Sequence, residues 1–404
     1  MNSARQEVLE ADDLLRMIML RCEHLGLRHF NLLKAVCPRW LAIAGTIDVA
    51  REWAVLSYDD FLGKENVDES YLRELCAPCD ACPLLWGGEE AVLVVESGVS
   101  LRGVKIVSTD GRLLRTFGGF PSGDYFNWSP AASPLSAALC GPMLFVTDAF
   151  STSAPLRVHT IGDGVDLDYF NKDMRGVGPG QLTFPAHIFM YDGGFPNAQD
   201  TRHALYVSDA TLNRISIFSF ELSSIISTWE HFGTIGGKGQ GLGPMPNKYV
   251  SGGMMNGMPN GSGEGDGEFT APAGIAVGRR QLYVADQENA RIQVFALTGE
   301  YVRTILLDEG SLPGGLAIGL SDRLLVGLQD RLLVLTLDGA LLQEVIVPPP
   351  QSPFACATML WSLRASQACA YATDLKRGII HKFKRIAPGE HVREFDAYGV
   401  ELVD

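Results

Sequence analysis

Residues 269–305 read FTAPAGIAVGRRQLYVADQENARIQVFALTGEYVRTI, and this stretch decides the fold. Short apolar runs alternate in it with turn residues, which predicts four strands, at 274–277, 281–285, 292–296 and 301–305. The second strand is closed by Asp286, and Phe295 follows nine positions later. Four short consecutive strands are the content of one blade of a β-propeller.

The same pattern, a hydrophobic strand with a closing residue and then a second strand, recurs along the chain. The closing positions fall near 96, 148, 209, 286, 327 and 374. Six copies with a basal spacing of about forty to fifty residues fit the length of propeller blades. The sequence therefore predicts an all-β fold, a six-bladed propeller over residues 91–404. We expect residues 392–395, or a strand near 54–58, to complete the ring.

The closing residue is most often an aspartate, and its position indicates a structural role. A carboxylate at the end of a strand can accept backbone N–H bonds from the turn that follows. Arg214 follows Asp209 by five positions, and Arg291 follows Asp286 by the same interval. We expect each arginine to pair with its aspartate.

The repeat resembles the NHL-repeat family of β-propellers. The residues that carry the resemblance are Pro272-Ala273-Gly274-Ile275-Ala276-Val277, Leu282-Tyr283-Val284-Ala285-Asp286, Asn289, Arg291-Ile292-Gln293-Val294-Phe295 and Gly299, with Asn213-Arg214-Ile215-Ser216-Ile217-Phe218 repeating the last strand in the previous copy. The resemblance implies a propeller used mainly as a platform for protein or RNA, with a few enzymatic relatives.

Glycine-rich runs lead into the blades. GVGPGQLTFP (176–185) and GEGDGEFTAP (263–272) are two such runs. Residues 233–267 contain 13 glycines in 35 positions, so we expect an inserted glycine-rich loop at about 233–267.

The first 47 residues have helical periodicity and resemble an F-box. The positions that match are Leu14, Leu15, Ile18, Val36, Cys37 and Trp40. The family usually has Leu-Pro at the front, where this chain has Ala11-Asp12. The resemblance implies an apolar face that docks a Skp-type adaptor; the alternative is a helical cap on the propeller. Residues 48–90 are expected to be a linker.

The linker contains a cysteine-rich loop, CAPCDACP. Cys76, Cys79 and Cys82 have the spacing of thiolates that converge on zinc or an iron–sulfur cluster, but no fourth ligand follows nearby. The alternative is ordinary reduced thiols, which also suits eight cysteines in a chain that starts without an apolar signal stretch. We therefore expect a cytoplasmic or nuclear protein.

The charge balance argues against a protein that binds mainly to phosphate backbones. The chain has 33 basic and 47 acidic residues, a net charge of −14. The one basic cluster lies in the last blade and comprises Lys376, Arg377, Lys382, Lys384 and Arg385. It is either a solvated outer edge or a contact for RNA or an acidic peptide.

Catalytic motifs are sparse. His187 takes the place of Gly274 in the best repeat, which aims it near the propeller axis, but a lone histidine is more often packed than catalytic. We expect a non-catalytic binding protein without a cofactor. The predicted function is substrate recruitment to a cullin-type ubiquitin ligase, with the target on the propeller and no membrane contact. The alternatives are a scaffold or RNA-binding propeller without a ligase link, and a metal-dependent hydrolase or lyase.

Overall fold

The computed structural model describes most of the repeat region of the chain. The described residues are 56–62, 78–97, 103–117, 133–151, 154–161, 174–222, 226–237, 263–319, 322–348, 359–366, 369–375, 377–385, 394–395 and 401–402. Ser57–Lys384 and Arg393–Asp404 belong to one compact unit. Among the described residues, no helix is long and apolar enough to cross a membrane.

Six antiparallel sheets follow one another along the chain, and we number them blades 1–6. Blade 1 consists of β2 (Pro78–Trp86), β3 (Glu89–Glu96), β4 (Gly103–Ser108) and β5 (Leu113–Phe117). Blade 2 consists of β6 (Pro134–Cys140), β7 (Met143–Asp148) and β8 (Leu156–Thr160). Blade 3 consists of β9 (Pro185–Phe195), β10 (Arg202–Asp209), β11 (Arg214–Leu222) and β12 (Ile226–Gly236). Blade 4 consists of β13 (Pro272–Gly278), β14 (Gln281–Asp286), β15 (Arg291–Ala296) and β16 (Tyr301–Leu306).

The last two blades complete the series. Blade 5 consists of β17 (Leu316–Gly319), β18 (Arg323–Gly327), β19 (Arg331–Thr336) and β20 (Leu341–Ile346). Blade 6 consists of β21 (Leu360–Ala365), β22 (Cys369–Asp374), β23 (Ile379–Arg385) and, on its outer side, β1 (Leu56–Leu62). A short 3-10 helix, η3 (Gln287–Asn289), lies between β14 and β15, and β24 (Glu394–Phe395) pairs with β25 (Glu401–Leu402).

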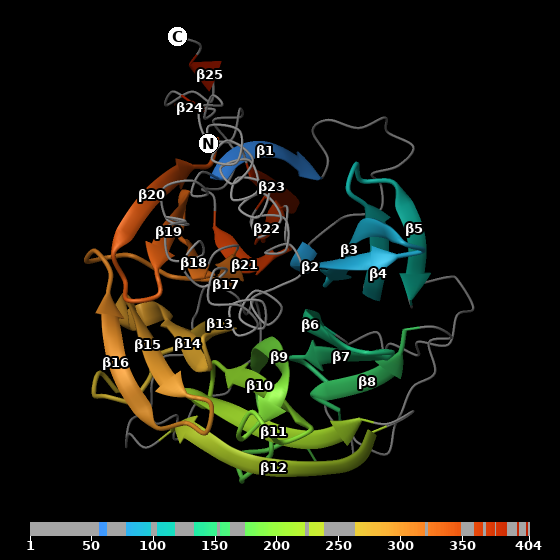
Figure 1. The fold of residues 1–404 in the computed structure, drawn as a ribbon, viewed down its shortest axis with the longest axis vertical. Coiled ribbons are helices and arrows are strands. Elements are labelled where there is room, and N and C mark those ends of the chain that lie inside the picture. Colours follow the sequence, from blue (N-terminus) through green and yellow to red (C-terminus); the bar gives the residue numbers. More distant parts are fainter. Residues whose placement is uncertain are drawn as a thin grey trace, which may run out of the picture. The chain divides into compact units, whose positions relative to one another are not determined.

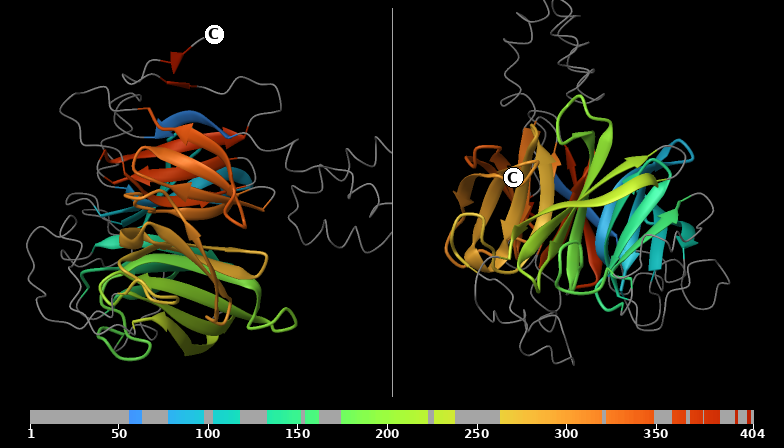
Figure 2. Two further views of the ribbon diagram at one scale, coloured as in Figure 1. Left: turned by 90° about the vertical axis from the view of Figure 1, so that its left-hand side faces the viewer. Right: turned by 90° about the horizontal axis from the view of Figure 1, so that it is seen from below.

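The sheets are arranged around a common axis, with the first strand of each blade innermost (Figure 1). Neighbouring blades touch largely through these inner strands, β2, β6, β9, β13, β17 and β21. The strands run from one face of the ring to the other, so that turns gather on two faces (Figure 2). The prediction of an all-β, six-bladed propeller is confirmed, including the four strands expected in residues 269–305.

The ring is closed by β1, which pairs with β23. Of the two candidates for the closing strand, the one near 54–58 is therefore correct, while β24 pairs with β25 instead. Residues 48–90 contain β1 and β2 and are not simply a linker. In particular, Cys79 and Cys82 lie in β2 and not in a loop, because the strand pairs along its length with the apolar strand β3.

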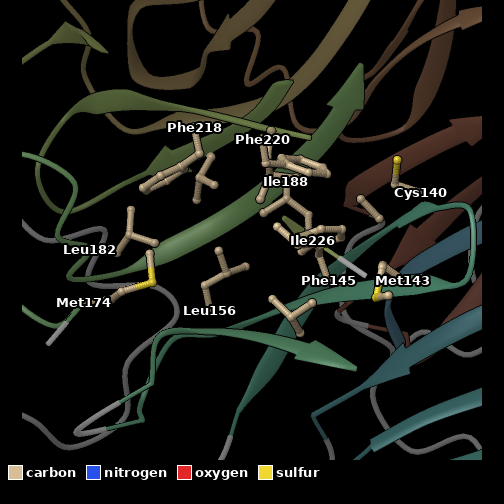
Figure 3. Close-up of a cluster of buried hydrophobic side chains, with 14 residues drawn as sticks. Cys140, Met143, Phe145, Leu156, Met174, Leu182, Ile188, Phe218, Phe220 and Ile226 are labelled. Carbon is tan, nitrogen blue, oxygen red and sulfur yellow. The ribbon is translucent and has the colours of Figure 1, made fainter. Parts of the chain in front are cut away.

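Packing between blades supplies the core. One cluster joins blades 2 and 3 and contains Phe145, Phe218 and Phe220, all of which are buried (Figure 3). The indole of Trp229 stacks on Phe218 at 5.1 Å between ring centroids. Each blade thus buries one face of its sheet against the next, which no single blade could do alone.

In blades 2, 3, 4 and 6 a closing carboxylate fastens the blade to the residues that lead into it. Asp209 accepts N–H bonds from Thr183 (2.6 Å) and Leu212 (3.1 Å), as expected for a cap. The expected ion pair is present for Asp286 and Arg291, at 2.7 Å.

Arg214 differs from that expectation, because its guanidinium donates to carbonyls of the glycine-rich run. The acceptors are Val177 (3.0 Å), Gly178 (3.0 Å) and Gln181 (2.6 Å). Arg291 binds the matching carbonyls of 264, 265 and 268 in the next blade. The glycine-rich runs are therefore compact arches held by an arginine of the third strand.

The glycine-rich insertion is narrower than expected. Residues 233–236 belong to β12, where they pair with β11, and residues 263–270 form the second arch. The intervening residues 238–262 and the F-box-like segment, residues 1–47, lie outside the described residues.

Candidate functional site

Six residues, each in the inner strand of its blade or directly before it, occupy equivalent positions at the propeller axis. Each lies near the start of the inner strand. On the second strand of the same blade, it faces the residue that comes just before the closing position. We call this set the axial ring: Asp80, Ser136, His187, Gly274, Gly315 and Ser362. His187 thus lies at the axis, as its place in the repeat predicted.

Asp80 is fully buried and binds two neighbouring blades at once. Its carboxylate accepts hydrogen bonds from Ser136 Oγ (2.6 Å) and Ala137 N (3.1 Å) of blade 2. From blade 6 it accepts bonds from Ser362 Oγ (2.5 Å) and from Arg364 Nε (3.1 Å) and Nη2 (2.7 Å). The carboxylate therefore links blade 1 to two neighbours: Oδ2 accepts from donors of blades 2 and 6, and Oδ1 accepts from donors of blade 6.

Arg364 completes the network. Its Nη2 also donates to Ile188 O (2.7 Å) and Ser136 Oγ (2.9 Å), so it reaches blade 3 as well. Burial alone would raise the pKa of Asp80, but the charge and hydrogen bonds of Arg364 and the two serine hydroxyls lower it to about 2. The buried pair is therefore ionised, and both carboxylate oxygens of Asp80 accept hydrogen bonds from Arg364.

The other half of the axis is closed by backbone. Gly274 N donates to Gly314 O at 2.9 Å, and Gly315 N donates to Leu360 O at 3.3 Å. A Cβ on Gly274 would lie 2.4 Å from Gly314 O, and one on Gly315 would lie 2.2 Å from Leu363 N. Only glycine allows the inner strands of blades 4, 5 and 6 to approach this closely.

His187 is the one member of the axial ring with an unused polar atom. Its side chain is 2% exposed, and Nε2 has no hydrogen-bond partner among the described residues. Burial lowers its pKa to about 4, with the charge of Asp80 opposing and that of Arg364 adding to the shift. The imidazole is therefore neutral near pH 7 and packs on Trp361, 5.0 Å away between ring centroids.

Sequence reasoning missed Asp80, Ser136, Ser362 and Arg364. A signal existed for the first two, because each lies two residues after a proline, as His187 and Gly274 do. Ser362 has no such proline, and Arg364 is two positions further along its strand, so only the fold brings them to the axis.

The two described cysteines of the CxxCxxC motif do not converge. Cys79 Sγ lies 2.9 Å from Ser97 Oγ, whereas Cys82 Sγ donates to Ala137 O at 3.3 Å. Burial raises the pKa of Cys79 to about 12, so this thiol stays protonated. Cys76 lies outside the described residues, and the described part of the chain holds no group of three or more His, Cys, Asp and Glu side chains arranged to bind a metal ion.

The basic cluster is engaged by the closing strand. Lys382 Nζ and Lys384 Nζ lie 3.2 and 3.1 Å from the two carboxylate oxygens of Asp59 in β1. Burial opposes the shift, but hydrogen bonds from both lysines lower the pKa of Asp59. Arg377 donates to Pro348 O at 3.0 Å, Arg385 ends β23, and Lys376 lies outside the described residues. These two lysines therefore help to hold β1 in place.

The predicted adaptor-docking residues lie outside the described residues. They are Leu14, Leu15, Ile18, Val36, Cys37 and Trp40. Their role therefore stays a prediction.

The outer strands of blades 4 and 5 expose more large apolar side chains than the other described outer strands do. Six of the eleven exposed large hydrophobic side chains in the described part of the chain lie there, and we call them the rim surface: Tyr301, Val302 and Leu306 of β16, with Leu341, Leu342 and Ile346 of β20. The two strands belong to neighbouring blades at the outside of the ring (Figure 1). Clustered exposed apolar side chains are typical of protein-binding surfaces.

Comparison with known families and structures places the repeat but not an activity. Residues 269–295 match the NHL repeat family. No curated protein matches the chain.

Among solved structures, a gluconolactonase from Xanthomonas campestris is 14% identical with a TM-score of 0.49, covering 83% of this chain and 99% of its own. A virginiamycin B lyase from Staphylococcus aureus is 11% identical with a TM-score of 0.43, covering 82% and 99%. A streptogramin B lyase is 12% identical with a TM-score of 0.48, covering 82% and 98%.

These structural relatives are enzymes, which overturns the expectation that the chain is a non-catalytic binding protein. That expectation rested on the scarcity of catalytic motifs in the sequence, and such a scarcity does not separate propeller enzymes from other propellers. At these identities the relatives establish no activity for this chain.

Proposed function

We propose that this chain recruits a target protein to a cullin-type ubiquitin ligase. The rim surface binds the target, and the F-box-like segment binds a Skp-type adaptor in the cytoplasm or nucleus. The observation that carries the recruiting role is the gathering of six exposed apolar side chains on two neighbouring outer strands. The link to the ligase rests on the sequence of residues 1–47.

The contacts at the propeller axis support target binding at the rim surface. The carboxylate and guanidinium at the axis are consumed by contacts between blades 1, 2, 3 and 6. These two charged groups are therefore occupied, whereas the apolar side chains of the rim surface are exposed to a partner. Tethering a target beside the ubiquitin-carrying enzyme raises its effective concentration, and that proximity is the mechanism of such an adaptor.

The adaptor half of the proposal is tested with purified full-length chain and a purified Skp-type adaptor on a gel-filtration column. We expect co-elution, and we expect Leu15→Asp combined with Trp40→Ala to abolish it. The double variant Leu306→Thr with Ile346→Thr should co-elute like the wild type, because it changes only the rim surface. Absence of a wild-type complex would refute the ligase link.

The target half is tested in cells that lack the chain. Proteins whose ubiquitination falls in these cells are candidate targets, and wild-type chain should restore their ubiquitination. We expect the Leu306→Thr, Ile346→Thr variant to fail in that restoration. Full restoration by this variant would show that the rim surface does not recruit the target.

A second candidate function is hydrolysis or elimination at the axis, with His187 as general base. The observation that favours it is the neutral imidazole whose Nε2 lacks a described partner. A screen of lactones with purified chain tests it, and turnover should fall by about 10²-fold or more in His187→Gln. Turnover that is absent, or unchanged in that variant, would exclude this role for His187.

A further inference from the structure

Among the described residues, no strand pairs with the outer edge of β16. The sheet order β13-β14-β15-β16 places β16 at the end of blade 4, and β20 ends blade 5 in the same way. The free edge of a terminal strand presents unpaired N–H and C=O groups, which are a template for pairing with another chain. This backbone template lies within the rim surface.

The side chains of β16 differ in burial along the strand, whose register with β15 shifts by one residue between Val294 and Phe295. Ile305 is buried in the core between blades 4 and 5, while Val302 and Leu306 are 43% and 78% exposed. In β20 the buried residue is Val345, and Leu342 and Ile346 are exposed at matching positions. The exposed residues of β12 in blade 3 are mostly polar: Thr228, Glu230, Phe232 and Thr234. Apolar edges of this kind are thus a feature of blades 4 and 5 and not of every outer strand.

The surroundings of these edges are acidic. Residues 300–346 contain seven acidic and three basic side chains. One of the acids, Asp322, is paired with Arg279 of blade 4 at 2.7 Å, so the net charge of this group is −3. Arg303 and Arg331 lie close to Asp338 and Glu344, at 3.6 and 3.9 Å, so their charges are already offset. A partner that brings positive charge therefore complements this surface.

The same charges disfavour a second copy of this chain as the occupant. Antiparallel pairing of β16 with itself would bring Glu300 of one copy beside Asp308 and Glu309 of the other. Like charges at facing positions of a strand pair are destabilising. The exposed apolar side chains and the acidic residues beside them therefore favour a strand from a different protein over a second copy of β16.

We propose that β16 binds an extended segment of a partner protein in which apolar residues alternate with lysine or arginine, by adding it as a fifth strand to blade 4. The partner's backbone pairs with the free edge, its apolar residues pack beside Val302 and Leu306, and its basic residues face the acidic flanks. This inference rests on the recruiting role proposed above and assigns the chemistry of the recruited segment.

The test uses a fluorescent ten-residue peptide of alternating valine and lysine, titrated with full-length chain. We expect saturable binding, weakened about tenfold or more in Val302→Thr with Leu306→Thr, since both apolar anchors are lost. Leu85→Thr is the matched control, because Leu85 is 73% exposed on blade 1, and it should bind the peptide as the wild type does. Thermal melting verifies that all variants fold.

Backbone pairing is tested separately with two peptides N-methylated at alternate residues, on the valines or on the lysines. Methylation removes N–H donors from one edge of the peptide and leaves charge and side chains in place. We expect at least one of the two peptides to lose about tenfold or more in affinity. Unchanged affinity for both, or equal binding by the β16 variant, would overturn strand addition.

The remaining outcomes separate the two proposals. A concentration-dependent dimer that the β16 variant dissolves would show that a second copy is the occupant and would overturn the inference. Peptide binding with the expected dependence, but no complex with a Skp-type adaptor, would leave strand addition standing and refute the ligase link. Target ubiquitination that depends on the rim surface, together with peptide binding that N-methylation does not change, would support the recruiting role and overturn strand addition.

Discussion

Replacement of Asp80 by alanine tests whether the axial network holds the ring together. The change removes the acceptor for Ser136, Ser362 and Arg364, and it leaves a guanidinium that is only 14% exposed without its counter-charge. Breaking a buried ion pair by removing one partner costs about 3–5 kcal/mol, because the remaining charge stays desolvated. We therefore expect Asp80→Ala to lower the free energy of unfolding by about 3–5 kcal/mol.

The partner variant supplies the control. Arg364→Leu leaves the carboxylate buried without the group that holds its pKa low, so a similar loss is expected. The double variant Asp80→Ala, Arg364→Leu leaves no unpaired charge, and its cost reduces to hydroxyls that lack an acceptor, at about 1–3 kcal/mol each. The sum of the two single-variant losses in unfolding free energy should therefore exceed the loss of the double variant by about 3 kcal/mol.

Equilibrium unfolding in urea measures these differences, with tryptophan fluorescence and far-UV circular dichroism as independent probes. Coincident transitions are required, because a repeat-built protein can unfold in steps. Trp361 packs on His187 in the axial ring and reports on this region by fluorescence. A loss below about 1 kcal/mol for Asp80→Ala, or additive single losses, would refute the view that the pair acts as one buried unit.

Three further changes test the axis and the closing strand. The pKa of His187 is lowered from 6.5 to about 4, so the neutral imidazole contributes fully to the free energy of unfolding above pH 6.5, and this contribution is lost as pH falls towards 4. The free energy of unfolding should therefore depend less on pH over that range in His187→Gln than in the wild type. Asp59→Asn should cost about 0.5–1 kcal/mol in urea unfolding, with a smaller cost at high salt, because its pair with Lys382 is partly exposed; a salt-independent loss would contradict an ionic role. Gly274→Ala should cost about 1–3 kcal/mol or more in thermal and urea unfolding, whereas Gly233→Ala, whose Cβ meets nothing within 4 Å, should cost under about 1 kcal/mol; equal effects would disprove close packing at the axis.

The fold could be predicted from the sequence because its signal is repeated. A single strand ending in Asp286 is weak evidence, but the same strand closed by Asp148, Asp209 and Asp374 fixes the blade length. The fifth copy was placed one residue early, since Leu328 and not Gly327 occupies the closing position when the register with β19 is followed. Without an aspartate at the closing position, the sequence does not show at which residue the strand ends.

The candidate sites were harder to predict, for a reason specific to each. Asp80 and Arg364 are 284 positions apart and meet only because the last blade closes against the first. The sequence predicts a solvated basic edge or a contact surface at Lys382 and Lys384, because their partner Asp59 lies in a segment that is predicted as a linker. The rim surface has no motif, since exposure of Val302 or Leu306 depends on which strand is outermost.

Ring closure explains why the chemistry of this propeller divides between inside and outside. A closed ring has to join strands from the two ends of the chain, and here two clasps do so: β1 pairs with β23 on the outside, and Asp80 pairs with Arg364 at the axis. Both clasps use charged side chains, and these side chains are occupied by the contacts. The carboxylate of Asp59 faces two lysines. The carboxylate of Asp80 accepts hydrogen bonds from five donors of blades 2 and 6. Blades 4 and 5 contribute no described residue to the contacts of Asp59 or Asp80, and their inner strands are joined through glycine backbone. The outer strands of these two blades expose apolar residues, and residues 300–346, which contain both strands, hold seven acidic and three basic side chains. These are the properties that a recruited basic strand needs.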